Sequence, residues 1–164
     1  MSNVDMTKPP YRSTDPVVKS KHLFCGTLLA KDLKKSRKFY EQALGLECVE
    51  IGEDRMLARP VFNPSQEKRQ FPNFVLDIRQ SDEIQNPQRV FHHWGLELES
   101  KKCVDQMHDF LMENKEEFEL QQVLEKTFQH SAYSFYFSDR DSNWWEFQFL
   151  PPATFEKVFT GDAV

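Results

Sequence analysis

The sequence predicts an α+β fold built from two tandem β-α-β-β-β modules. The order of strand and helix patterns over residues 21–79 is repeated over residues 90–150, and a unit of roughly 60 residues that occurs twice is an internal repeat. The second module closes with residues 130–149, which have the pattern of a strand, a short polar turn and another strand.

The composition indicates one ordinary globular domain. The chain has 164 residues, which suffices for a buried core, and its net charge of −5 argues against a nucleic acid partner. No apolar run is long enough to cross a membrane, and the first twenty residues lack the apolar core of a secretory signal. Three cysteines (Cys25, Cys48 and Cys103) lack the spacing of a disulfide framework, which indicates reduced thiols and a cytoplasmic location.

In the first module, residues 21–30 are expected to form a strand. Asp32 is a suitable N-cap for a helix over residues 33–44, because its carboxylate can accept from the free N–H groups of the first turn. Gly45 is expected to end this helix in a left-handed conformation. The other strands of this module are predicted at residues 46–51, 55–62 and 71–79.

The second module begins again after a polar linker at residues 80–89. A strand is expected over residues 90–99, and Ser100 caps a helix to about residue 114, on whose polar face His108 would be solvated. Its other strands are predicted at residues 117–124, 130–138 and 143–150.

These two modules predict one domain over residues 20–150 with a segment on each side. Residues 1–19 carry three prolines and several small polar residues, as expected of a flexible N-terminal arm. Residues 151–164 form a C-terminal extension that begins with two prolines and then has helical spacing of its apolar residues.

Glu146 lies in the middle of the last predicted strand, among aromatic residues. Alternation places Trp144, Glu146 and Gln148 on one face of this strand and Trp145, Phe147 and Phe149 on the other. A buried carboxylate is costly unless it is paired or binds a metal. Glu146 is therefore expected either to be paired or to bind a metal.

Two segments carry a resemblance to a known family. AKDLKKSRKFYEQALGL (30–46) and YFSDRDSNWWEF (136–147) resemble the first helix and the last hairpin of the vicinal oxygen chelate superfamily. This superfamily includes glyoxalase I, bleomycin- and fosfomycin-resistance proteins and extradiol dioxygenases. In the second segment Arg140 replaces the usual Pro and Ser142 the usual Gly.

The resemblance implies that the two modules form a curved, mostly antiparallel cup with one divalent metal inside it. Its ligands would come from the last strand, at Glu146, and from the first strand of each module, seven residues before the helix cap. That position is His93 in the second module and Cys25 in the first, where metal enzymes of the family usually carry His. Fe(II) or Mn(II) is expected, or zinc if the thiolate binds. Water in the third position, or no metal at all, remains open.

The resemblance also implies two candidate acid–base groups. Tyr136 stands ten residues before Glu146, where extradiol dioxygenases commonly carry a catalytic Tyr, and His130 lies on the same strand face. The alternative is that Tyr136 is an ordinary strand tyrosine and His130 a surface histidine.

These residues predict a metal-dependent small-molecule enzyme, of dioxygenase type, that acts on a vicinally oxygenated aromatic substrate. The aromatic content of 13% is compatible with such a pocket. One alternative is a metal-free protein that binds and sequesters a ligand, as resistance proteins of this family do. Another is a lyase or isomerase of the same fold. Because modules of this family often pair across chains, a homodimer is expected.

Overall fold

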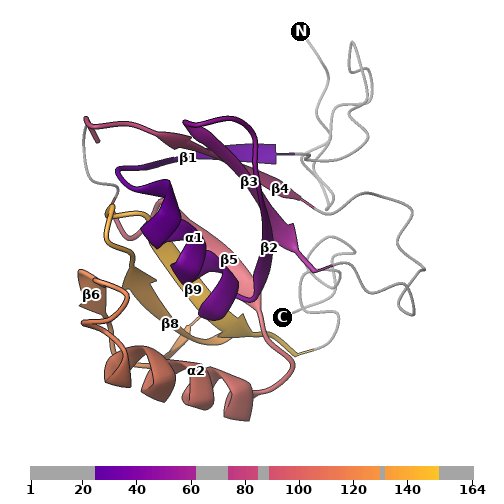
Figure 1. The fold of residues 1–164 in the computed structure, drawn as a ribbon. Coiled ribbons are helices and arrows are strands. Elements are labelled where there is room, and N and C mark those ends of the chain that lie inside the picture. Colours follow the sequence, from indigo (N-terminus) through magenta and orange to yellow (C-terminus); the bar gives the residue numbers. More distant parts are fainter. Residues whose placement is uncertain (1–24, 62–73, 85–88, 130–131, 152–164) are drawn as a thin grey trace, which may run out of the picture.

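The computed structural model describes residues 25–61, 74–84, 89–129 and 132–151 (Figure 1). The predicted N-terminal arm, His130 and all of the predicted C-terminal extension except Pro151 lie outside these residues. The elements are β1 (Cys25–Ala30), α1 (Leu33–Gln42), β2 (Leu46–Glu50), β3 (Arg55–Pro60), β4 (Val75–Gln80), β5 (His93–Glu97), α2 (Lys101–Glu113), β6 (Gln122–Val123), β7 (Thr127–Gln129), β8 (Ala132–Ser138) and β9 (Trp144–Phe149).

The strands form two open sheets, one in each module. The first sheet has the order β1-β4-β3-β2, and the second has the order β5-β9-β8-β6, with β7 also paired to β8. In each sheet the first strand of the module runs parallel to the last one (β1 to β4, β5 to β9), and all other pairs are antiparallel. The predicted α+β architecture of two mostly antiparallel modules is confirmed.

Both helices begin where the sequence predicts. The side chain of Asp32 accepts a hydrogen bond from the backbone N–H of Lys35, and that of Ser100 accepts one from Cys103. Gly45 follows α1 with φ +65°, the left-handed conformation expected of it. Neither helix in the described part of the chain is long and apolar enough to span a membrane.

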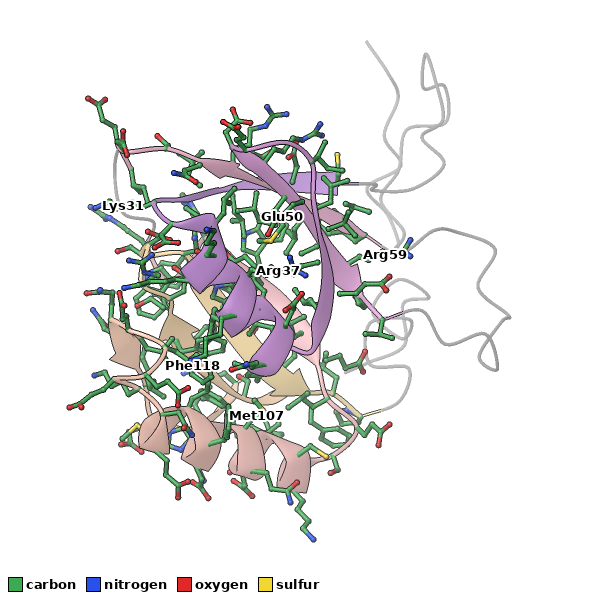
Figure 2. The ribbon with its side chains drawn as sticks, viewed as in Figure 1. Lys31, Arg37, Glu50, Arg59, Met107 and Phe118 are labelled. Carbon is green, nitrogen blue, oxygen red and sulfur yellow. The ribbon has the colours of Figure 1, made fainter. Side chains whose placement is uncertain are left out.

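The predicted strand at residues 117–124 is wrong in most of its length, because the chain makes turns after α2 instead. The N–H of Phe118 bonds to the carbonyl of Asn114, the N–H of Leu120 bonds to that of Lys115, and Glu119 has φ +55°. Phe118 (Figure 2) reaches the core through this turn, where its ring lies 5.6 Å from that of Phe39. Only the two residues of β6 are extended within the predicted range.

His108 is buried rather than solvated, which corrects its predicted place on a polar helix face. Its side chain lies in the stripe of α2 that also buries Val104 and Leu111. The imidazole packs edge-on against Phe135, with ring centroids 5.0 Å apart. The spacing of four and three residues to Val104 and Leu111 is the helical signal that places it there.

The core lies where α1, a helix of the first module, packs between the two sheets. Figure 1 shows α1 lying between the first sheet and strand β9. The ring of Tyr40 lies 5.5 Å from that of Trp145, and the ring of Phe39 lies 6.2 Å from that of Phe137. On the outer side of α1, Arg37 forms an ion pair of 2.9 Å with Glu50 of β2 (Figure 2).

The turn between β8 and β9, residues 139–143, bonds the second module to the first. Asp141 accepts hydrogen bonds from the backbone N–H of Lys31 at 3.1 Å and the hydroxyl of Ser36 at 3.3 Å. The side-chain amide of Asn143 donates to the carbonyl of Leu29 at 3.1 Å. These contacts hold the end of β1 and the start of α1 against the hairpin that carries Glu146.

Candidate functional site

The candidate site is on the face of the second sheet that is turned away from the helices. Residues on neighbouring strands of this face are set side by side by the sheet register, in which Glu146 on β9 pairs with Tyr136 on β8 and with Gly95 on β5. His93 is two residues before Gly95 and therefore on the same face. We call this surface, with His93, Gly95, Tyr136, Glu146 and Gln148, the site face.

His93 and Glu146 meet on the site face. Nε2 of His93 lies 3.2 Å from Oε2 of Glu146, and the carboxylate is buried. Nδ1 of His93 lies 2.7 Å from the carbonyl oxygen of Val90. Because a carbonyl can only accept, Nδ1 carries a hydrogen and donates it, and in a neutral ring Nε2 then presents a lone pair to the carboxylate. Two acceptors facing each other require a cation between them, either a proton or a metal ion.

Tyr136 completes this group. Its ring lies edge-on to that of His93, with centroids 4.9 Å apart. Burial and the nearby carboxylate of Glu146 raise the pKa of Tyr136 to about 12. The phenol is therefore protonated at neutral pH, close to the carboxylate.

The structure brings together His93, Glu146 and Tyr136, but not Cys25. Cys25 begins β1 in the first sheet, where it is exposed. Among the described residues there is no group of three or more His, Cys, Asp or Glu side chains that could hold a metal ion. Of the three predicted ligands, the described chain therefore brings together His93 and Glu146.

Gly95 and Gln148 belong to the same surface, and the sequence analysis assigned them no role. The signal that could have found them is alternation, which places Gly95 two residues after His93 and Gln148 two residues after Glu146. A glycine inside a strand often marks a close approach of a ligand or of another backbone.

The two modules and the site face define a protein of the glyoxalase fold class. A family model described as the Glyoxalase/Bleomycin resistance protein/Dioxygenase superfamily matches residues 20–147. The chain belongs to this superfamily. No curated protein matches the sequence.

Several solved structures have the same fold. A possible glyoxalase from Bacillus cereus is 23% identical, with a TM-score of 0.58 over 78% of this chain and 98% of that one. A mutant of the fosfomycin resistance protein FosX from Listeria monocytogenes, complexed with Mn(II) and 1S,2S-dihydroxypropylphosphonic acid, is 17% identical, with a TM-score of 0.60 over 84% and 95% of the two chains. At these identities the similarity shows the fold.

Proposed function

We propose that this protein is a metal-dependent small-molecule enzyme of the vicinal oxygen chelate type, with His93 and Glu146 as ligands of a divalent cation. The observation that carries this proposal is the 3.2 Å approach of two acceptor atoms, Nε2 of His93 and Oε2 of Glu146. The bond from Nδ1 to the carbonyl of Val90 supports it further, because metal-binding histidines commonly donate their other ring N–H in this way. When bound, the cation would polarise oxygen atoms of the substrate as a Lewis acid.

The chain's own residues would position and protonate the substrate. Tyr136 keeps its proton at neutral pH, and its hydroxyl is at the Glu146 carboxylate, where it would donate to a substrate oxygen. Its place beside the ring of His93 favours the dioxygenase type of chemistry on an aromatic substrate with neighbouring hydroxyl groups. His130 is proposed as a further acid or base at the mouth of the cup, on the sequence pattern alone.

Fe(II) or Mn(II) is the proposed metal, and zinc is the choice if a thiolate joins the site. A histidine and a carboxylate suit these ions, and the FosX neighbour holds Mn(II). Where a thiolate joins the site, it is that of Cys25 from a second copy of the chain.

A homodimer is proposed because the outer face of the first sheet offers a surface for a second copy. Cys25, Val49, Leu57 and Val75 share this face by register. Val49 is 58% exposed, and a groove of about 330 Å³ lies between Val49, Leu57 and Val75. Apposition of this face to the site face of a second copy would bring Cys25 toward His93 and Glu146.

The metal content of the purified, untagged protein tests this function. Elemental mass spectrometry should find about one divalent ion per chain, which Glu146→Gln should lose with its far-UV circular dichroism unchanged. Glu97→Gln is the matched control, because Glu97 is an exposed carboxylate on the same face of β5. Absence of metal from the wild type after anaerobic loading with Fe(II) would reject the proposal.

The second candidate is a metal-free protein that binds a small ligand, and the observation that favours it is the incomplete ligand set of the single chain, as far as the described residues show it. In this protein a proton would join His93 to Glu146. Its ligand affinity would not change with EDTA, whereas the proposed enzyme would lose affinity. A lyase or isomerase with Glu146 as base is separated from a dioxygenase by whether oxygen from labelled O₂ enters the product.

A further inference from the structure

Gly95 lies beside Glu146 on the site face and carries no side chain. The two residues are register partners on adjacent strands. A Cβ atom built on Gly95 would point to the site face and meet only two described atoms within 4 Å, Nε2 of Gln148 at 3.3 Å and Cδ of Gln148 at 3.9 Å. The carboxylate of Glu146 approaches His93 instead. The amide of Gln148 therefore lies over the bare backbone of Gly95, beside the pair of His93 and Glu146.

The Gln148 carboxamide has free hydrogen-bonding capacity beside Glu146. Its side chain is half-buried, and its backbone carbonyl accepts from the N–H of Leu98 at 2.7 Å, which fixes the strand at this point. Among the hydrogen bonds of the described residues, none involves the carboxamide of Gln148. Its neighbour Glu146 is paired with His93 at 3.2 Å. Gln148 thus presents an unused donor next to this pair.

We propose that Gln148 is a substrate-positioning residue, whose amide donates a hydrogen bond to an oxygen of the small molecule bound at His93 and Glu146. This inference rests on the proposed function. A neutral amide suits the role, because it binds a substrate oxygen without competing with Glu146 for a cation. Gly95 leaves room for this amide, because the methyl group of alanine would stand 3.3 Å from Nε2 of Gln148.

The chemistry of these groups defines the ligand class. The substrate carries one oxygen for the pair of His93 and Glu146 and a second acceptor oxygen, such as a hydroxyl, carbonyl or carboxylate, on the side of Gln148.

Binding of Mn(II) alone and of three probes to the Mn-loaded protein (catechol, glycolate and phosphonoacetate), measured by isothermal titration calorimetry, tests the inference. Gln148→Met keeps the length of the side chain but removes the amide. It should leave the Kd for Mn(II) within about twofold and weaken the best probe by about tenfold, the effect of one hydrogen bond. Gly95→Ala should weaken the same probe. Gln129→Met, at an exposed position on β7, is the matched control and should change neither affinity.

The outcomes separate the two proposals. Equal probe affinity of wild type and Gln148→Met would overturn the role of Gln148, as would the failure of every probe to bind the Mn-loaded wild type. Failure of the wild type to bind Mn(II) or Fe(II) would overturn the proposed function itself, and the role of Gln148 would fall with it. A parallel loss of Mn(II) affinity in Gln148→Met would show a structural role instead of substrate positioning.

Discussion

The indole ring of Trp94 on β5 occupies the place that a side chain on Gly26 of β1 would take. A Cβ atom built on Gly26 would overlap the six-membered ring of Trp94. The two strands belong to different modules and different sheets. Gly26 is therefore required for the contact between the modules, and this requirement is independent of its backbone conformation.

Gly26→Ala should destabilise the protein by about 1–3 kcal/mol, the usual cost of overpacking a well-packed interior. The free energy of unfolding from urea titrations measures this effect. Trp94→Phe in the same chain should recover part of the loss, since the smaller ring leaves room for the methyl group. Thr27→Ala, at the exposed next position of β1, should have little effect, and an equal loss there would contradict the steric explanation.

Asp139 should make stability depend on pH. Burial raises the pKa of this carboxyl from 3.8 to about 6 against the opposing hydrogen bonds from Asn143 and Trp145. A raised folded-state pKa contributes stability that is complete below about pH 4 and is lost as the pH rises through about 6. The free energy of unfolding of the wild type minus that of Asp139→Asn should therefore fall by about 2 kcal/mol between pH 4 and pH 7.

Chemical denaturation at several pH values measures this difference. Asp82→Asn, at an exposed position, is the control and should follow the wild type throughout. A difference between wild type and Asp139→Asn that stays constant with pH would show that Asp139 titrates near the ordinary pKa of an aspartate.

Cys25→His should raise the affinity for Mn(II) by about tenfold, because imidazole suits this ion better than thiolate does. The effect requires Cys25 of a second copy to reach His93 and Glu146, so it tests the dimer and the third ligand together. Thr27→His places an imidazole on the same face of the same strand and should leave the affinity unchanged. Equal Mn(II) affinities of the wild type, Cys25→His and Thr27→His would show that Cys25 is not a ligand.

Tyr136→Phe should retain the metal within about tenfold and lose turnover by about a hundredfold or more, the usual contribution of a general acid or base. Oxygen uptake with catechol as substrate measures turnover. Tyr133→Phe is the matched control, because Tyr133 lies on the opposite face of β8, where its hydroxyl donates to Asp105 at 2.8 Å. Loss of turnover in Tyr133→Phe but not in Tyr136→Phe would show that the acid–base group is not on the site face.

Local signals predicted much of the fold and two residues, His93 and Glu146, that meet on the site face. The caps at Asp32 and Ser100 and the glycine at residue 45 are set by backbone hydrogen bonding within one turn, so sequence alone reveals them. His93 was placed by counting back from a cap and Glu146 by its position after a polar turn. Each count starts from a local structure that the sequence reveals. In the structure the two residues meet on adjacent strands.

The remaining features depend on long-range packing. The imidazole of His108 is buried because Phe135 of β8 covers it, and a polar residue type suggested the opposite. The pattern of residues 117–124 predicts a strand, but Phe118 enters the core from a turn. The location of Cys25 relative to Glu146 depends on how the two sheets pack, which no local pattern in the sequence encodes.

The turn at residues 139–143 affects the order in which the parts of the chain fold during synthesis. Ser36, Tyr40 and the N–H of Lys31 find their hydrogen-bond acceptors on Asp139 and Asp141, about a hundred residues later in synthesis. A ribosome-bound chain that ends before this turn exposes these groups and the apolar side of α1 to solvent. The first module therefore completes its native contacts only after the last hairpin has emerged, and folding of the two modules ends in one late, shared step.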